Sequence, residues 1–350
     1  MSEKKVYLVT GGAGFIGVNF VKHILKKHEN KAVVINFDAL TYAGNLKSLA
    51  DIEKNKDYKF IKGDISSPAD VDNLFKNHKI NYVVNFAAES HVDRSIIDST
   101  PFIKTNIMGT QILLDATRKY GVDRYLQVST DEVYGSLGET GLFTEETPLA
   151  PNSPYSASKT SADLLVRAAY HTHKMPVLNT RCSNNYGPYQ FPEKLIPLMI
   201  ANVLNKKPLP IYGKGLNVRD WLYVIDHCEA IDTVLLHGKI GEIYNIGGNN
   251  EWKNIDIVNI IIDILEKRGY KDGKSLITYV KDRPGHDMRY AIDSTKMQCE
   301  LGWKPSVTFE KGIEITIDWY LENQAWWRDI MSGEYMKYYE TNYKEKFNSK

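Results

Sequence analysis

The chain has 350 residues, of which 43% are hydrophobic and 25% charged, and its formal net charge is +1. These values are typical of a globular protein with a sizeable core, and so small a charge favours neither nucleic acid nor a membrane surface as a partner. No secretory signal pattern precedes the first apolar segment, and no apolar run reaches transmembrane length. Three widely spaced cysteines, Cys182, Cys228 and Cys299, predict buried free thiols and no zinc site. We therefore expect a cytoplasmic protein without bound metal.

Short apolar runs alternate with helical patterns through the first half of the chain. Strands are predicted at 6–10, 32–38, 58–65, 80–90, 124–130 and 176–182, and helices over 15–27, after Pro101 and over 154–173. Because apolar strands alternate with helices, the pattern predicts a parallel sheet covered on both faces, a Rossmann-type doubly wound α/β fold.

The pattern changes after Cys182, where five prolines between positions 188 and 210 interrupt it. Residues 242–248 predict one more strand, which returns to the first sheet. We therefore expect a larger domain over 1–182 joined by this strand, a smaller C-terminal α/β domain over 183–330, and a polar, tyrosine-rich tail over 331–350.

A glycine motif, TGGAGFIG at 10–17, lies between the first predicted strand and helix and contains Gly11, Gly14 and Gly17. Glycines there allow a tight turn and a close approach of the backbone to a pyrophosphate, and the helix N-terminus supplies N–H donors. Asp38 ends the next strand, where a carboxylate binds the adenosine ribose hydroxyls. No Arg or Lys follows it in DALTYAGN, so the pattern favours NAD over NADP. The alternative is a structural turn followed by an ordinary aspartate.

Tyr155 and Lys159 are four residues apart, so they share one face of the predicted helix. A phenol is a poor base at neutral pH, but a neighbouring ammonium and a positive nicotinamide ring both favour the phenolate. Such a pair can remove a hydroxyl proton while hydride passes from the same carbon to NAD. Alone it would be an ordinary surface pair, but after a dinucleotide motif the redox role is favoured.

Two adjacent carboxylates, Asp131 and Glu132, follow Thr130 at the end of the strand predicted over 124–130. The carboxyl ends of parallel strands face the ligand crevice of an open α/β sheet. The pair is either part of that crevice or a solvated loop, and the residues alone favour the loop.

Together these segments resemble the extended short-chain dehydrogenase/reductase family, and within it the nucleotide-sugar 4,6-dehydratases. Sugar epimerases of the same superfamily share the glycines and the Tyr/Lys pair but typically lack the Asp-Glu pair, which a dehydratase needs in order to expel water. The resemblance covers most of the chain and rests on the glycine motif and on DALTYAGN (38–45), AAESHVDRS (87–95), STDEVYG (129–135), SPYSASK (153–159), RCSNNYGPYQFPEKLIP (181–197), VRDWLYV (218–224) and DRPGHDMRY (282–290).

The resemblance implies a three-step reaction on a nucleotide-linked glucose. Tyr155 takes the O4 proton, with Thr130 hydrogen-bonded to O4, as hydride passes from C4 to NAD. Glu132 then removes the C5 proton while a protonated Asp131 donates a proton to the departing 6-hydroxyl. Hydride finally returns to C6, which gives a 4-keto-6-deoxy sugar nucleotide and regenerates NAD. One shared proton lets adjacent carboxylates divide these roles.

The resemblance also assigns binding residues. Those implied to contact NAD are Gly11, Gly14, Phe15, Ile16, Gly17, Asp38, Ala39, Leu40, Thr41, Asp64, Ile65, Ala87, Ala88, Thr105, Tyr155, Lys159 and Asn185. Those implied to contact the sugar nucleotide are Ser90, Thr130, Asn184, Lys194, Leu195, Pro210, Ile211, Tyr212, Arg219, Asn254, Asp282, Arg283, Pro284, Gly285 and His286. Arg219 and Lys194 suit the pyrophosphate. The alternatives are an Arg219–Asp220 ion pair and a solvated Lys194.

Several alternatives stay open at this point. The resemblance favours thymidine diphosphate glucose, but a uridine diphosphate glucose or N-acetylglucosamine dehydratase is the alternative, because the two bases differ by one methyl group. A 4-epimerase and a non-catalytic NAD-binding module are less favoured. Phe86 stands where a smaller aliphatic residue is expected beside the adenosine. The family is usually homodimeric, and the pairing helices would here be about 101–119 and 154–173.

Overall fold

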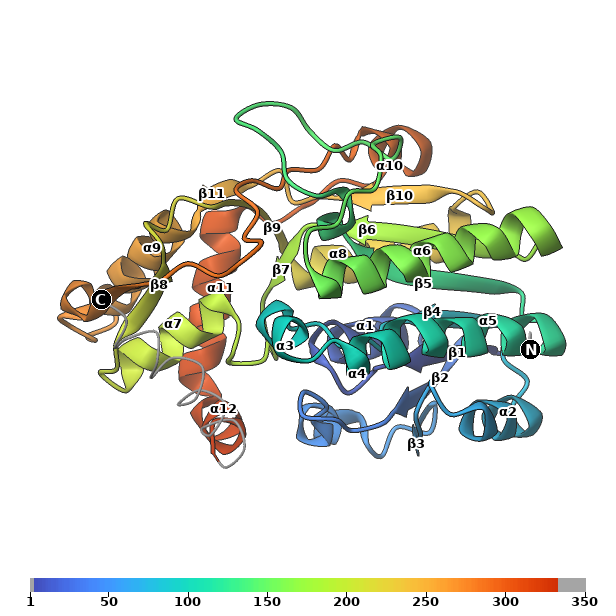
Figure 1. The fold of residues 1–350 in the computed structure, drawn as a ribbon. Helices are drawn as coiled ribbons and strands as arrows, with labels where there is room; N and C mark the ends of the chain where they lie inside the picture. The colour runs from blue at the N-terminus through green and yellow to red at the C-terminus, as the bar shows by residue number, and fades with distance from the viewer. Residues whose placement is uncertain (1–2, 333–350) are drawn as a thin grey trace.

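The computed structural model describes residues 3–332, so residues 333–350 of the predicted tail lie outside the described part. Its main sheet has seven parallel strands in the order β10-β6-β5-β4-β1-β2-β3 (Figure 1). The order reverses between β1 and β4, as in Rossmann folds, which confirms the predicted fold class. The strands are β1 (Lys5–Thr10), β2 (Ala32–Asp38), β3 (Tyr58–Lys62), β4 (Tyr82–Asn85), β5 (Arg124–Thr130), β6 (Val177–Cys182) and β10 (Ile243–Ile246).

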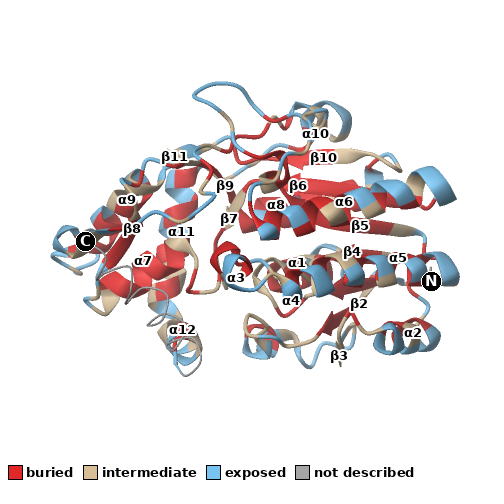
Figure 2. Cartoon of the chain, in the orientation of Figure 1, coloured by how far each residue is buried: buried red, intermediate tan, exposed pale blue. Residues whose placement is uncertain are grey.

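Both faces of this sheet are buried, because side chains alternate along each strand and both sets are apolar. In β1, Tyr7 and Val9 pack into one core and Leu8 into the other. Helices α1 (Phe15–Lys27) and α8 (Val224–His237) pack on the first face, and α2 (Pro68–Asn77), α5 (Thr110–Tyr120) and α6 (Pro154–His173) on the second. Figure 2 shows the strands buried between these layers. Each buried aliphatic side chain contributes about 1.5–3 kcal/mol.

Helix α6 spans 154–173 as predicted, because its beginning is encoded locally. Ser153 and Ser156 form a reciprocal capping box, and Pro154 occupies the first turn. Farther along the helix, Asp163 forms a buried ion pair with Arg181 of β6, with Oδ2 2.9 Å from Nε. The caps set where the helix begins, and the ion pair fixes its rotation against the sheet.

Two predicted strands are shorter in the structure. The strand predicted at 58–65 ends at Lys62, and the one predicted at 80–90 covers only Tyr82–Asn85. Beyond Asn85 the chain leaves the sheet, and the Asn106 side chain binds the backbone N–H and C=O of Glu89 at 2.9 and 3.0 Å. A remote side chain therefore satisfies the polar groups that a strand ladder would have used.

The helix predicted after Pro101 contains a change of pitch. It begins as α4 (Thr100–Phe102), widens into the π-helix η2 (Ile103–Gly109) and continues as α5. The widened turn contains Thr105, a predicted cofactor residue, and the buried Asn106. Such π turns occur most often at functional sites.

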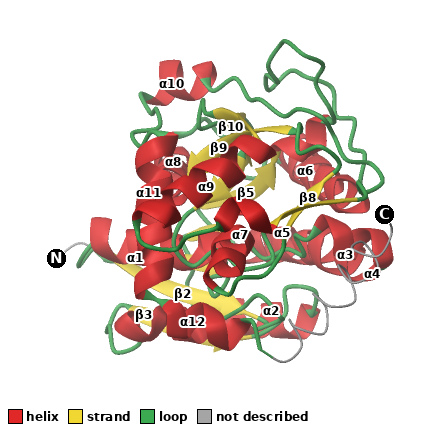
Figure 3. Ribbon diagram, turned by 90° about the vertical axis from the view of Figure 1, so that its left-hand side faces the viewer, coloured by secondary structure: helices red, strands yellow, loops and turns green. Residues whose placement is uncertain are grey.

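The C-terminal lobe has its own core, which includes the fully buried Ile196, Ile261 and Phe309. A three-stranded sheet (β11-β9-β7) and a parallel pair (β12-β8) lie among its helices, which face the viewer in Figure 3. Its strands are β7 (Asn184–Tyr186), β8 (Leu209–Tyr212), β9 (Val218–Tyr223), β11 (Glu251–Lys253) and β12 (Ile277–Val280). Its helices are α7 (Leu195–Leu204), α9 (Asn254–Lys267), α11 (Phe309–Glu322) and α12 (Gln324–Ile330), whereas α10 (Thr295–Leu301) packs against β10 and α8 of the larger domain.

The remaining short helices are α3 (Val92–Ile97) and the 3-10 turns η1 (Leu46–Ile52), η3 (Asp131–Tyr134) and η4 (Gly273–Leu276). Over residues 3–332, no helix is both long and apolar enough to cross a membrane. Cys182 and Cys228 are buried free thiols as expected, but Cys299 is exposed, because it lies on the outer side of α10.

We expect Asp163→Ala to lower the free energy of unfolding by about 3–5 kcal/mol, because it leaves the Arg181 guanidinium buried and unpaired. Urea denaturation would measure the loss. Asp318→Ala is the matched control, since it removes the more exposed Asp318–Arg268 pair and should lower the free energy by about 0–1 kcal/mol. Equal losses in the two variants would contradict a special role for the buried pair.

Candidate active site

A cleft of about 340 Å³ opens at the carboxyl ends of the central strands. Residues that follow β1 to β6 line it, and the loop over 190–194 closes one side. The strand order reverses between β1 and β4, and ligands of doubly wound sheets bind beside such a reversal. The cleft therefore lies where the sequence predicted a cofactor crevice.

The glycine turn in this cleft has the shape that a dinucleotide pyrophosphate requires. Gly11 has a φ of +68°, and a Cβ atom there would lie 2.7 Å from the backbone nitrogen of Ala87. A Cβ atom on Gly17 would lie 2.2 Å from the carbonyl oxygen of Gly11. No side chain caps the N-terminus of α1 at Gly14, so its first N–H groups can serve an anion. The residues present fit the predicted cofactor.

Asp38 is buried beside this turn. Its carboxylate accepts hydrogen bonds from the backbone N–H groups of Ala13, at 2.9 Å, and Leu40, at 2.7 Å. Burial raises the pKa of Asp38, and these two hydrogen bonds oppose the increase. The carboxylate therefore holds the loop over 38–45 against the glycine turn.

Most of the predicted cofactor residues line the cleft. The exception is Leu40, which has a φ of +55° and packs against the hydrophobic core. The residues that line the cleft are Gly11, Gly14, Phe15, Ile16, Gly17, Asp38, Ala39, Thr41, Asp64, Ile65, Ala87, Ala88, Thr105, Tyr155, Lys159 and Asn185.

Thr130, Asp131, Glu132, Tyr155 and Lys159 all line the same cleft. The Thr130 hydroxyl accepts a hydrogen bond from the Glu132 N–H at 3.3 Å and donates one to Asp131 Oδ1 at 3.2 Å. This hydroxyl also lies near the Tyr155 phenol and opposes the increase in the pKa of that phenol. Thr130 thus caps η3 and places the carboxylates near the phenol, so the pair does not form a solvated loop.

The two carboxylates have different surroundings. Asp131 is 1% exposed, and its Oδ2 has no hydrogen-bond partner among the described residues. Burial, followed by the charge of Glu132, raises the pKa of Asp131 well above its ordinary value. Burial also raises the pKa of Glu132, but three cations oppose that increase, namely Arg283, Arg219 and Lys194. The surroundings therefore favour a proton on Asp131 more strongly than on Glu132.

The Tyr155 phenol is neutral in the chain by itself. Burial, followed by the charge of Glu132, raises its pKa well above the ordinary value. Lys159 donates a hydrogen bond from Nζ to the carbonyl of Val128 at 2.7 Å, and burial lowers the pKa of this ammonium. The backbone N–H of Tyr155 donates to Ser95 Oγ at 3.2 Å, which fixes the first turn of α6 to α3.

The predicted sugar-nucleotide residues fall into two groups. Ser90, Thr130, Asn184 and Lys194 line the cleft. The others belong to the C-terminal lobe and do not line it, namely Leu195, Pro210, Ile211, Tyr212, Arg219, Asn254, Asp282, Arg283, Pro284, Gly285 and His286.

Neither alternative for the two predicted pyrophosphate residues matches the structure. Arg219 lies over the Tyr290 ring at 4.2 Å and donates to the Asp287 carbonyl at 2.9 Å. Asp220 instead accepts backbone hydrogen bonds from the loop at 248–250. Lys194 is partly buried and donates to the Ser90 carbonyl at 3.0 Å, so it is not simply solvated.

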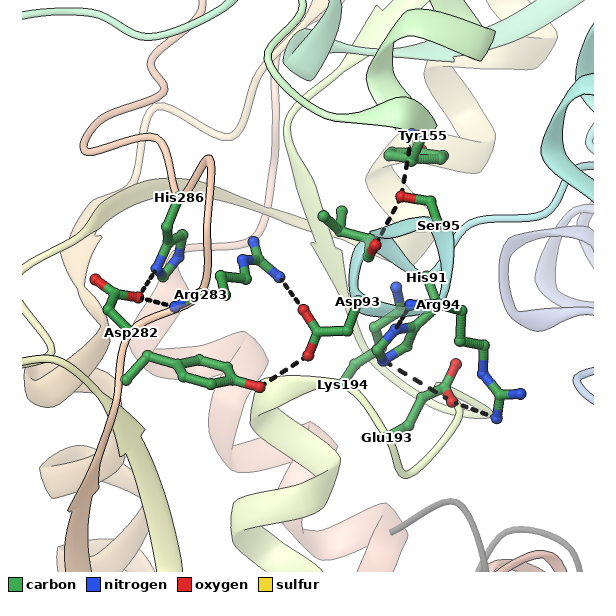
Figure 4. A network of polar contacts seen from close by, with 12 residues as sticks. His91, Asp93, Arg94, Ser95, Tyr155, Glu193, Lys194, Asp282, Arg283 and His286 are labelled. Atoms are coloured by element: carbon green, nitrogen blue, oxygen red, sulfur yellow. Dashed lines mark hydrogen bonds and ion pairs between the residues drawn. The ribbon is translucent and has the colours of Figure 1, made fainter. Parts of the chain in front are cut away.

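Helix α3 connects the predicted substrate residues to helix α6 (Figure 4). Asp93 accepts hydrogen bonds from Tyr212 at 2.8 Å and from Arg283 at 3.2 Å. Two residues later, Ser95 binds the backbone of Tyr155. No separate sequence signal marked Asp93 or Ser95, and only their place in AAESHVDRS could have drawn attention to them.

Phe86, which the sequence placed beside the adenosine, lines the cleft and packs against Phe20 at 5.1 Å between ring centroids, so the larger side chain is accommodated. Other residues of the cleft were missed. The lining residues without a predicted role are Phe37, Ala43, Gly44, Gly63, Phe86, Glu89, Val128, Ser129, Cys182, Ser183, Gln190, Phe191 and Glu193. Among residues 3–332, no group of three or more His, Cys, Asp or Glu side chains could hold a metal ion.

We expect Asp131→Asn to become increasingly stable, relative to the unmutated chain, as the pH rises from 4 to 8. The raised pKa of Asp131 means that its contribution to stability is complete below the unfolded pKa of about 3.9 and is lost as the pH rises through the folded pKa. Asparagine does not ionise and avoids this loss. Urea denaturation at several pH values would measure the difference, and a pH-independent difference would contradict the prediction.

Comparison with known proteins identifies the family. A family model for GDP-mannose 4,6 dehydratase matches residues 8–316. A dTDP-glucose 4,6-dehydratase of Xanthomonas campestris pv. campestris (strain B100) is 58% identical over 342 residues, covering 94% of this chain and 97% of that protein. The dTDP-glucose 4,6-dehydratase of Bacillus anthracis, solved in complex with NAD, shows 53% identity and a TM-score of 0.86 over 93% of this chain and 99% of that one. The Streptomyces venezuelae dTDP-glucose 4,6-dehydratase, solved with NAD and TYD bound, shows 46% identity and a TM-score of 0.88 over the same shares. The chain therefore belongs to the GDP-mannose 4,6 dehydratase family of extended short-chain dehydrogenases/reductases.

Proposed function

We propose that the chain is an NAD-dependent dTDP-glucose 4,6-dehydratase, a hydro-lyase that converts dTDP-glucose to dTDP-4-keto-6-deoxyglucose. The observation that carries the proposal is the placement of Asp131 and Glu132 beside Tyr155 and Lys159 in one dinucleotide-type cleft. Relatives with this activity are similar over nearly the full chain. Oxidation alone requires only the Tyr155/Lys159 pair, whereas elimination of water requires both a base and an acid.

Tyr155 is the proposed base for the 4-hydroxyl. Bound NAD supplies the hydride acceptor and donor, and the positive charge of its nicotinamide ring favours the phenolate. Lys159 adds a second positive charge four residues along the same buried helix face. Thr130 lies near the phenol, where it opposes the increase in the phenol pKa and is placed to share the substrate oxygen.

The elimination step belongs to the two carboxylates. Glu132, kept partly ionised by the surrounding cations, removes the C5 proton that the neighbouring ketone has acidified. Asp131, kept protonated by burial, donates its proton to the departing 6-hydroxyl. Proton removal and proton donation are thus assigned to adjacent residues with opposite charge preferences.

The two halves of the chain divide the binding of the ligands in this proposal. Residues 1–182, with the strand near 242–248, hold NAD, and residues 183–330 supply the sugar-nucleotide site. Lys194, Arg219 and Arg283 bring three positive charges toward the Glu132 side of the cleft, which suits a diphosphate.

Incubation of the NAD-loaded protein with sugar nucleotides tests the proposal. We expect dTDP-glucose to give the 4-keto product, which absorbs in strong alkali, faster than UDP-glucose or UDP-N-acetylglucosamine does. Faster conversion of a uridine nucleotide would reassign the substrate. Formation of a 4-epimer without loss of water would indicate an epimerase, and NAD binding without any turnover would indicate a binding module.

We also propose that the protein acts as a homodimer in the cytoplasm. Ile103, Met108 and Leu164 are apolar and exposed on the helices predicted to pair, η2 and α6. Cys182 and Cys228 are buried without disulfides, which suits a reducing compartment. Sedimentation equilibrium should give twice the chain mass, and a monomer at micromolar concentration would contradict the dimer.

We expect Asp131→Asn to lower turnover of dTDP-glucose about 10²–10⁴-fold, because hydroxyl is a poor leaving group without a proton. The loss should be much smaller for a substrate with fluoride at C6, which needs less protonation. Rates of the unmutated protein and the variant on both substrates measure the effect. A loss of the same size for both leaving groups would assign Asp131 to positioning.

We expect Glu132→Gln to abolish exchange of the C5 hydrogen with deuterium oxide while C4 oxidation continues, because the amide cannot accept the C5 proton. Mass spectrometry of recovered sugar nucleotide would measure the exchange. Tyr155→Phe is the matched control, since its block precedes the formation of the ketone and no step should proceed. Normal deuterium incorporation in Glu132→Gln would remove Glu132 from this role.

A further inference from the structure

Three segments meet around Tyr42, and none of these contacts has a role in the proposed chemistry. The Arg94 guanidinium of α3 lies over the Tyr42 ring at 4.0 Å. Phe191 meets the same ring edge to face, with 5.7 Å between ring centroids. Glu193 lies near the Tyr42 hydroxyl, which opposes the increase in the pKa of its carboxyl, and pairs with Arg94 at 3.3 Å. We call Tyr42, Arg94, Phe191 and Glu193 the clasp.

The clasp joins opposite walls of the cleft. Tyr42 belongs to the loop over 38–45, which begins at the buried Asp38, and its neighbours Thr41, Ala43 and Gly44 line the cleft. Phe191 and Glu193 line the cleft from the loop over 190–194. Figure 4 shows Arg94 reaching Glu193 from α3. Contacts between these side chains therefore tie the cofactor side of the cleft to the substrate side.

The contacts are of a strong kind. The Glu193 side chain is 4% exposed and that of Arg94 is 27% exposed, so the ion pair is largely shielded from water. A planar guanidinium can stack on an aromatic ring and pair with a carboxylate at the same time, which lysine cannot do. The same carboxylate lies near Tyr42, because its charge is among the causes that raise the pKa of the Tyr42 phenol, after burial.

We propose that the clasp retains NAD in the cleft through the whole catalytic cycle, with Tyr42 and Arg94 as its positioning residues. This inference rests on the proposed function, in which the cofactor takes two electrons and a hydrogen from C4 and returns them to C6. A cofactor that leaves between these steps leaves behind an unsaturated ketone, with a double bond between C5 and C6, that cannot receive the hydride at C6. The reaction therefore requires slow release of the cofactor, and the clasp closes the two walls around it.

The test measures NAD release directly, without any sugar nucleotide. The protein is loaded with isotopically labelled NAD, diluted into unlabelled NAD and sampled over time. We expect Tyr42→Ala and Arg94→Met each to release NAD roughly 10- to 100-fold faster, from the loss of an aromatic pair and a cation–aromatic contact. The variant with both substitutions should release NAD at about the same rate as the faster of the two single variants, because both changes remove one shared contact.

Conservative variants separate the clasp from general damage. Tyr42→Phe keeps both ring contacts and removes only the hydroxyl near Glu193. It should therefore release NAD less than about fivefold faster than the unmutated protein. Arg94→Lys loses the stacking and should resemble Arg94→Met. If Tyr42→Ala and Arg94→Met fail to fold, the NAD release rates of Tyr42→Phe and Arg94→Lys test the proposal instead. Equal release rates in Arg94→Lys and the unmutated protein would overturn it.

A matched control removes a cation–aromatic pair outside the cleft. Lys22 lies over Tyr189 at 4.5 Å and likewise joins the N-terminal half to the region after β7. Lys22→Met should release NAD at the same rate as the unmutated protein. If it releases NAD as fast as Arg94→Met does, the effect is not specific to the clasp and the proposal is overturned. During turnover, the clasp variants should also lose activity progressively and regain it when NAD is added. Unchanged NAD release in folded clasp variants would overturn the clasp, whereas failure to convert dTDP-glucose would overturn only the proposed function.

Discussion

The geometry of the site depends on one buried cation. Arg181 of β6 pairs with Asp163 of α6 and donates a second hydrogen bond, of 3.0 Å, to the Tyr134 hydroxyl at the end of η3. Tyr134 in turn donates to Asn245 of the returning strand β10. A single guanidinium therefore holds three elements, directly or through Tyr134: helix α6, the turn with the two carboxylates, and the edge strand β10. Because its planar group offers five donors in fixed directions, all three elements are held in one orientation.

Electrostatics in the cleft are set by burial first and by neighbouring charge second. Burial disfavours charge on Asp131, Glu132 and Tyr155 alike. The three cations from the C-terminal lobe offset this effect at Glu132 in particular. At Asp131 the lobe acts in both directions, because Asp220 raises the pKa of this carboxyl and Arg219 lowers it. The second lobe therefore favours ionisation of Glu132 more than that of Asp131.

The sequence predicted those parts of the fold that are encoded over a few residues. Helix α6 begins where expected because Ser153, Pro154 and Ser156 define its start. The early end of β4 was not predictable, because it depends on Asn106, which lies far along the chain and satisfies the backbone of Glu89. The small sheets of the C-terminal lobe were missed for the same reason, since their short strands pair with distant segments.

The candidate site shows the same division. Tyr155, Lys159 and the glycine turn form motifs with fixed spacing, so a resemblance could locate them. Asp93 and Glu193 have no motif of their own, and their importance comes only from partners that folding brings to them. Leu40 shows the converse, because a residue inside a recognised segment turns away from the cleft when the backbone adopts a positive φ.

The π turn of η2 has a consequence for the phase of the helix that contains it. A regular α-helix advances by 100° per residue, so the extra residue in a π turn rotates everything that follows relative to what precedes it. Within η2, Ile103 and Met108 are exposed, and in α5, which follows it, Leu113 and Leu114 are buried. Deleting one residue between 103 and 109 would restore a regular helix. It would then either bury the exposed pair, Ile103 and Met108, or expose the buried pair, Leu113 and Leu114. The number of residues in this segment is therefore as important to the fold as their identity.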